Sequence, residues 1–153
     1  MDANPTLLNL LSKRLAAAGA LLFFIGVLTG IWAAAALTGQ VKVAAPHLAL
    51  AAHLNGLLGG LWLIAVAWTF QFLHYREAGL RRLAVAVSIP AWANWLVTLS
   101  ASLLGVNGLI YTNDATNNLI AVLLQVLVVI PTFISCGFWV WGFRDRKQST
   151  RVN

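Results

Sequence analysis

His53 is the residue of this chain with the clearest capacity for chemistry. It lies in the run 46–73, which is rich in Ala, Leu and Gly and contains no Asp, Glu, Lys or Arg. An imidazole in such a run is costly unless it faces a partner inside a helical bundle. Gly56 and Gly60 follow at helical spacing and form a strip without side chains beside the ring. A flat ligand with a metal at its centre would fit there, which points to a haem held by His53, Gly56 and Gly60.

A second polar group lies in a later apolar run. Asn94 and Thr98 share one helical face with small residues, and Trp92 and Trp95 flank that face. If this face lies opposite the glycine strip, it leaves room for a cofactor and a small substrate. The two indoles could then supply an aromatic wall.

The three histidines limit the chemistry of such a haem. His47 lies on another face of the same predicted helix, and His74 lies at the opposite membrane edge from His53. Electron-carrying b haems in membrane bundles usually have two histidine ligands, whereas one ligand leaves an open position that can act as a Lewis acid toward a substrate. The histidine count favours catalysis over electron transfer unless a neighbouring subunit supplies a ligand.

The composition places these residues in a membrane. Apolar residues make up 60% of the 153 residues and charged residues 9%, with a mean hydropathy of +0.82, whereas a soluble domain has about a quarter charged residues. Four tracts nearly without charge each exceed the length of about 20 residues that crosses a bilayer. They cover residues 15–37, 46–73, 83–111 and 117–143. We predict an all-α bundle of four transmembrane helices that forms a single integral membrane domain over residues 1–153.

The basic residues indicate membrane topology rather than a nucleic-acid ligand. The net charge is +6, and of the ten lysines and arginines only Lys42 lies on the side away from the two termini. This positive-inside bias predicts that both termini and the connection around 76–82 are cytoplasmic. The basic side chains there also contact anionic lipid headgroups. We therefore expect a multi-pass protein of the cytoplasmic (inner) membrane, in contact with the lipid bilayer and without nucleic acid.

Each assignment has a simpler structural interpretation. His53 could be a packed histidine bonded to a neighbouring carbonyl, and two glycines four residues apart are a common pattern of helix packing. Asn94 and Thr98 could join helices without touching a substrate. The non-enzymatic alternative is a haem-free tetraspan protein that packs against a partner membrane protein.

The segments around His53 and Asn94 resemble a group of small membrane isomerases. The runs AHLNG at 52–56, GGLWLIA at 59–65 and ANWLVTL at 93–99 are similar to the hydroxylaminobenzene mutases and, more distantly, to the styrene oxide isomerases. The first-span segment 18–30 and the closing WGFR at 141–144 fit the same group. The resemblance covers nearly the whole chain.

This resemblance implies a four-helix isomerase for a small aromatic substrate, which needs no external electron donor. From the styrene oxide isomerases it implies a homo-oligomer, a trimer, with a ferric haem b whose iron is ligated by His53. As catalytic residues, Asn94 would hold the substrate or a polar edge of the haem, and Thr98 would assist. The residues expected to line the substrate are Trp92, Trp95 and Gly59.

Departures from the epoxide isomerases decide between the two reactions. Gly59 stands where they have an Asn, Thr98 where they have an active-site Tyr, and Pro90 where they have an Asp. Ala18 replaces a first-span histidine that is common in the group. We therefore expect conversion of hydroxylaminobenzene to 2-aminophenol, an intramolecular transfer of a hydroxy group, with isomerisation of styrene oxide to phenylacetaldehyde as the alternative.

Overall fold

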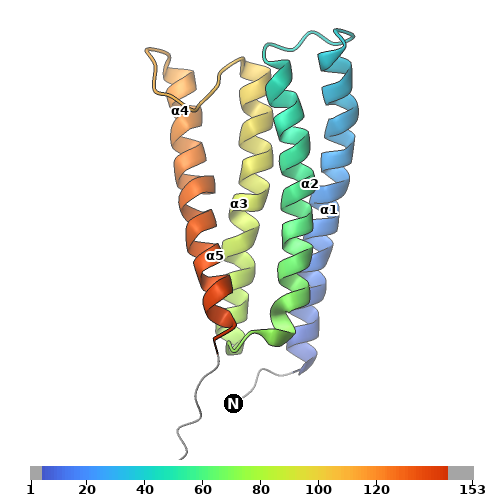
Figure 1. Ribbon diagram of the computed structural model, residues 1–153, viewed down its shortest axis with the longest axis vertical. Helices are drawn as coiled ribbons and strands as arrows, with labels where there is room; N and C mark the ends of the chain where they lie inside the picture. Colours follow the sequence, from blue (N-terminus) through green and yellow to red (C-terminus); the bar gives the residue numbers. More distant parts are fainter. Residues whose placement is uncertain (1–4, 145–153) are drawn as a thin grey trace, which may run out of the picture.

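Four long helices in antiparallel order make up the computed structural model, which describes residues 5–144 (Figure 1). The elements are α1 (Pro5–Leu37), α2 (Pro46–Thr69), the 3-10 turn η1 (Phe70–Phe72), α3 (Glu77–Leu104), α4 (Ala115–Leu123), the π-helical segment η2 (Leu124–Val129) and α5 (Ile130–Gly142). No strand occurs between residues 5 and 144. Each of the four helical spans is long and apolar enough to cross a membrane, so the predicted all-α fold with four spans is confirmed.

The bounds of two predicted spans differ from the helices. The described part of α1 already includes residues 5–14, ahead of the predicted start at residue 15, because a helix can continue past the charge-free tract. α3 runs from Glu77 to Leu104 instead of 83–111. Gly105 follows it with a left-handed φ of 70°, a conformation that commonly ends helices. The last seven residues of the predicted third span therefore lie in a connection.

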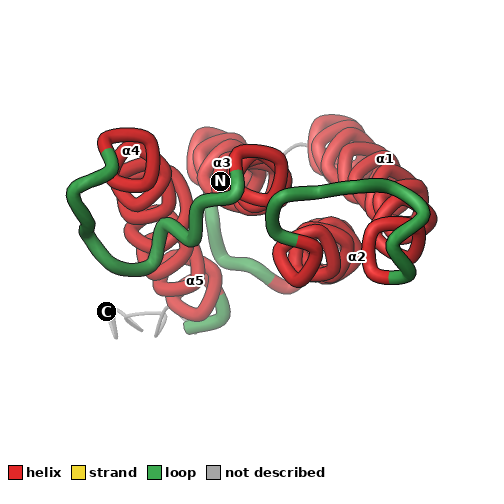
Figure 2. Tube along the Cα trace, turned by 90° about the horizontal axis from the view of Figure 1, so that it is seen from above, coloured by secondary structure: helices red, strands yellow, loops and turns green. Residues whose placement is uncertain are grey.

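The helices form a row in which α2 and α3 are central (Figure 2). α2 packs against α1 and α3, α1 also touches α3, and the fourth span packs along the other flank of α3 through η2 and α5. Leu22, Leu63, Val66 and Val87 are fully buried in the core between the first three helices. The start of α1, the connection from α2 to α3 and the end of α5 lie at one end of the bundle, here called the terminal end (Figure 1).

Glycines bring α1 and α2 unusually close together. A methyl group on Gly60 would lie 2.7 Å from the carbonyl oxygen of Gly19, and one on Gly56 would lie 2.7 Å from the Cα atom of Gly26. These separations are shorter than van der Waals contact, so a larger residue would push the helices apart. Small residues serve the same purpose at many membrane helix interfaces.

Two aromatic residues attach the end of α5 to the rest of the bundle. The Tyr75 hydroxyl, in the connection before α3, donates a hydrogen bond to the carbonyl oxygen of Phe138 at 2.7 Å. Trp139 Nε1 donates to Thr69 Oγ1 at the end of α2, at 2.9 Å. Burial raises the pKa of Tyr75 above its ordinary value, so the hydroxyl, already protonated at neutral pH, stays a donor to higher pH.

Candidate functional site

His53 lies in the seam between α1 and α2. Its Nδ1 is 2.8 Å from the carbonyl oxygen of Gly26, and a methyl group on Gly30 would lie 2.6 Å from the same nitrogen. Because a carbonyl oxygen can only accept, Nδ1 is the donor and the lone pair of the neutral ring is on Nε2. Nε2 has no hydrogen-bond partner among residues 5–144, and the side chain is half-buried.

This geometry fits a histidine that ligates a metal through Nε2. Metal-bound histidines usually donate their other N–H to a carbonyl or carboxylate, which fixes the tautomer and the ring orientation. In the part of the chain that the structure describes, no group of three or more His, Cys, Asp or Glu residues could hold a bare metal ion. A metal on His53 would therefore need its other ligands from elsewhere, and a porphyrin supplies four. The same hydrogen bond also fits the simpler interpretation of a packed histidine.

The glycine strip beside His53 packs against α1. Gly56 contacts Gly26 and the indole of Trp95, and Gly60 contacts Gly19. The sequence predicted room for a cofactor only if this strip faced Asn94 across an open space, and in the structure α1 covers the strip instead. Gly56 and Gly60 make the contacts expected of a helix-packing pattern. Their role in holding a cofactor stays a prediction.

A polar cluster lies on the other flank of α2, where α2 meets α3. Asn55 Nδ2 donates hydrogen bonds to Asn94 Oδ1 at 3.1 Å and to Thr98 Oγ1 at 3.0 Å. Thr98 is buried, and the two asparagines are half-buried. Asn94 and Thr98 therefore share one face of α3, as predicted. We call Asn55, Asn94 and Thr98 the amide cluster.

Asn55 is the member of the amide cluster that the sequence interpretation missed. A helical projection of α2 places Asn55 about 200° from His53, and the projection alone names no partner for it. The signal that could have identified it is the cost of an amide inside an apolar span, which predicts a polar partner on a neighbouring helix. The structure shows that Asn94 and Thr98 are those partners.

Trp92 and Trp95 form an edge-to-face pair on α3, with ring centroids 6.4 Å apart and planes at 88°. Trp95 Nε1 donates to Thr29 Oγ1 of α1 at 3.1 Å. Because its indole also contacts Gly56 of α2, Trp95 joins its own helix, α3, to both α1 and α2. The predicted aromatic pair is present, and Trp95 is held by a hydrogen bond to Thr29, whereas contact with a substrate stays a prediction.

His53 and Asn94, which the sequence suggested would form one site, lie on different sides of α2 in the structure. His53 is bonded to α1, whereas Asn94 is bonded to Asn55 on the α3 side of α2. Gly59, expected to line the substrate, lies near both α1 and α3: a methyl group there would be 3.2 Å from Leu22 Cδ2 and 3.4 Å from the carbonyl oxygen of Ala91. The residues therefore form two neighbouring polar positions on either flank of α2.

The fold and site define a class of protein: a multi-pass helical membrane protein whose second span has a histidine bonded to the first span and an amide bonded to the third. Residues 11–144 match the family model described as styrene oxide isomerase, and the chain belongs to that family. It is 28% identical over 143 residues to hydroxylaminobenzene mutase HabB of Ectopseudomonas oleovorans, an alignment that covers 88% of this chain and 82% of that protein. The expected family is confirmed, and the protein is a membrane isomerase.

Proposed function

We propose that this isomerase converts hydroxylaminobenzene to 2-aminophenol in the inner membrane, with a haem b bound at His53. The observation that carries the proposal is the unpartnered Nε2 of His53, whose Nδ1–H is held by Gly26 in a membrane-spanning seam. Membership of the isomerase family and similarity to a hydroxylaminobenzene mutase support the reaction class. The reaction breaks the N–O bond and forms a C–O bond at the ortho carbon. That carbon loses a proton and nitrogen gains one, so no electrons are exchanged with an outside donor.

His53 would hold the haem iron through Nε2 while the Gly26 carbonyl and Gly30 keep the ring in place. A haem with one protein ligand supplies an open iron position that can act as a Lewis acid toward a substrate oxygen or nitrogen. The protein's contribution at this point is an imidazole whose orientation is fixed by the hydrogen bond from Nδ1 to Gly26.

Asn94 is the group that we propose donates to the substrate. Asn55 occupies its Oδ1, so the Asn94 amide is oriented, and its Nδ2 has no hydrogen-bond partner among residues 5–144. Two N–H donors are therefore available for a hydroxyl or amine of the substrate. Thr98 would assist through its hydroxyl, and Trp92 and Trp95 would contact the arene.

The surroundings of Gly59 and Pro90 favour the mutase reaction over epoxide isomerisation. A styrene oxide isomerase is expected to have polar side chains at these two positions. Here Gly59 packs near Leu22 and Ala91, and Pro90 is fully buried in α3. Neither residue can supply a side-chain hydrogen bond to an epoxide.

We also propose that the protein acts as a homo-oligomer, a trimer. Apart from the contacts of its last turns with Thr69 and Tyr75, the fourth span packs along one flank of α3 in the described chain and leaves large apolar side chains exposed, with Phe133 at 78%. Gln125 is exposed in the π-helical segment in the middle of this span. A polar side chain is costly in lipid and usually faces protein, which a second copy would provide.

Activity and absorption measured on one preparation test these proposals. We expect purified protein to show a Soret band and to form 2-aminophenol from hydroxylaminobenzene without NAD(P)H, with little action on styrene oxide. Rapid formation of phenylacetaldehyde from styrene oxide, with hydroxylaminobenzene unchanged, would reverse the choice of reaction. Absence of both the Soret band and activity would support the haem-free tetraspan protein. The detergent-corrected mass from light scattering tests the trimer, and an active monomer would contradict it.

A further inference from the structure

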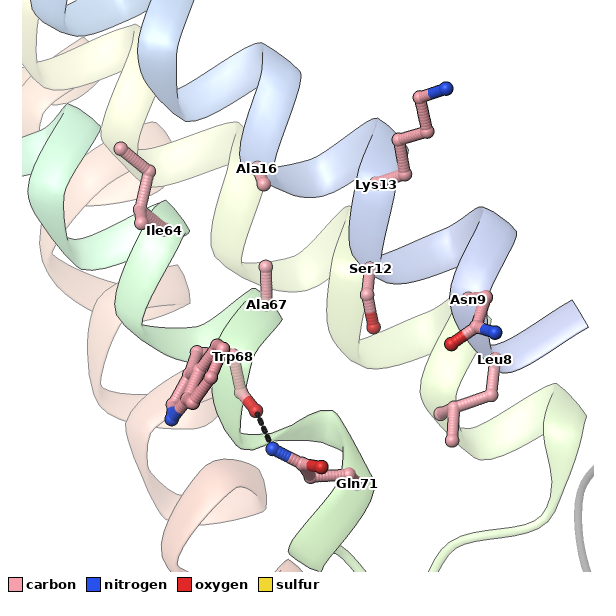
Figure 3. A pocket seen from close by; sticks show the side chains of 9 residues that line it. All are labelled: Leu8, Asn9, Ser12, Lys13, Ala16, Ile64, Ala67, Trp68 and Gln71. Carbon is pink, nitrogen blue, oxygen red and sulfur yellow. Dashed lines mark hydrogen bonds between the residues drawn. The ribbon is translucent and has the colours of Figure 1, made fainter. Parts of the chain in front are cut away.

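The seam between α1 and α2 opens into a groove at the terminal end of the bundle, far along α2 from His53 (Figure 3). The groove has a volume of about 340 Å³ and is lined by the first turns of α1 and by the end of α2 with η1. None of its lining residues belongs to the seam around His53 or to the amide cluster. The groove is therefore separate from the proposed active site.

The polar lining residues lie at the outer end of the groove, where the apolar Leu8 also lies, and the deeper lining is apolar. Asn9, Ser12 and Lys13 of α1 lie at the outer end together with Gln71, whose Nε2 donates to the carbonyl oxygen of Trp68 at 3.3 Å. Deeper toward the middle of the span, Ile64 and the indole of Trp68 form an apolar wall (Figure 3). Trp68 is 72% exposed, so its indole is available to a ligand. A molecule that fits both halves must itself be amphipathic.

Lys13 lines the outer end of the groove, where its exposed side chain extends outward from α1 and away from α2 (Figure 3). Among residues 5–144, Glu77 is paired with Arg81 at 2.7 Å, and Asp114 caps α4 at the opposite end of the bundle. The described part of the chain therefore provides no carboxylate for Lys13. Ser12 and Asn9 offer hydrogen-bond donors on the groove side of α1, and the long, exposed Lys13 side chain can turn to add a charged donor to a phosphate group there.

We propose that this groove binds one anionic phospholipid, whose headgroup phosphate contacts Ser12 and Asn9 and is reached by the Lys13 amine when its exposed side chain turns toward the groove. One acyl chain lies against Ile64 and Trp68. A free phosphate would contact only the polar half and leave the indole exposed. A neutral lipid would leave the charge of Lys13 unmatched. Basic positions between transmembrane helices at the headgroup level are recognised binding places for such lipids.

Native mass spectrometry of the full chain in detergent can test the site with two lipids of identical acyl chains, phosphatidylglycerol and phosphatidylcholine. We expect phosphatidylglycerol to bind about five-fold more tightly, the preference that one lysine near a headgroup provides. Lys13→Gln should remove this preference. Lys42→Gln makes the same charge change at the opposite end of the bundle and should retain it. Trp68→Ala should weaken the binding of both lipids.

Inorganic phosphate, added as a competitor, separates a lipid site from a simple anion site. We expect millimolar phosphate to leave phosphatidylglycerol bound, because phosphate cannot replace the acyl-chain contact with Trp68. Equal binding of the two lipids, an unchanged preference in Lys13→Gln, or displacement by phosphate would each overturn the proposal. Lys13 is exposed, so its replacement should leave the fold intact, which a single symmetrical elution peak would verify.

Discussion

The hydrogen bond between His53 and the Gly26 carbonyl decides which ring nitrogen can act as a ligand. We expect His53→Ala to lose both the Soret band and isomerase activity, because Nε2 would be the only protein ligand to the iron. His47→Ala and His74→Ala serve as controls and should keep most of the haem. Haem content would be measured by the pyridine haemochrome spectrum. Full haem retention in His53→Ala would refute the coordination.

Gly30 provides a finer test of the same ring. A methyl group at this position would lie 2.6 Å from the imidazole, so Gly30→Ala must move the ring or α1. We expect a reduced haem content or a shifted Soret band in a protein that still folds. Gly137→Ala is the matched control, because a Cβ atom there would have no neighbour within 4 Å. An unchanged spectrum in Gly30→Ala would show that the ring position does not govern haem binding.

Asn55 should act through Asn94. Removing the Asn94 amide is expected to lower turnover about 100-fold with the Soret band intact, by analogy with the loss of one oxyanion donor. Asn55→Ala keeps the Asn94 side chain but removes the hydrogen bond that orients it. The loss of a hydrogen bond worth about 1 kcal/mol predicts a smaller decrease in turnover, of about five-fold. Steady-state kinetics of both single variants and the double variant measure the coupling. Additive effects would mean that Asn55 does not position Asn94.

At the scale of the helices, the close contact between α1 and α2 forms the interface in which His53 lies. A methyl group on Gly60 would lie 2.7 Å from a backbone oxygen of Gly19, and backbone cannot rotate away as a side chain can. We expect Gly60→Ala to destabilise the protein by about 1–3 kcal/mol, the usual cost of overpacking. Thermal unfolding in detergent, followed by circular dichroism, measures it. Gly137→Ala should be neutral or slightly stabilising, and equal melting of the two variants would contradict the close packing.

Helix limits were less predictable than helix number. Charge-free tracts mark the part of a helix that lipid can surround, so they gave the four spans but not where the backbone stops being helical. Gly105, which ends α3 with a left-handed φ, lies inside such a tract. Lys13 and Arg14 lie outside the first tract and yet inside α1, because a helix can extend into the headgroup region.

At the scale of the whole molecule, the distribution of basic residues predicts a membrane orientation. With both termini cytoplasmic, a reporter fused after Asn153, which lies outside the described residues, should give a cytoplasmic signal. A fusion in the connection between α1 and α2, near Lys42, should give a periplasmic one. Paired alkaline phosphatase and green fluorescent protein fusions measure the two positions. The reverse pattern would invert the orientation and place the proposed lipid groove in the outer leaflet.

The sequence by itself determined the number of spans and the residue most able to bind a metal. Long tracts without charge must form helices in a bilayer, because lipid offers no hydrogen bonds to an open backbone. An imidazole in such a tract is costly enough to draw attention to His53 from composition alone. The segments around His53 and Asn94 also identified the family, which the comparison with known proteins confirmed.

The tertiary structure decided which helix each face meets. Helical periodicity places Gly56 and Gly60 on one face and Asn55 on another, but it cannot tell that α1 covers the glycines or that α3 receives the amide. Those choices depend on how the glycines of α1 fit those of α2, a contact between residues more than 25 positions apart. The tautomer of His53 has the same origin, because its Nδ1 proton is held by a carbonyl oxygen of a different helix.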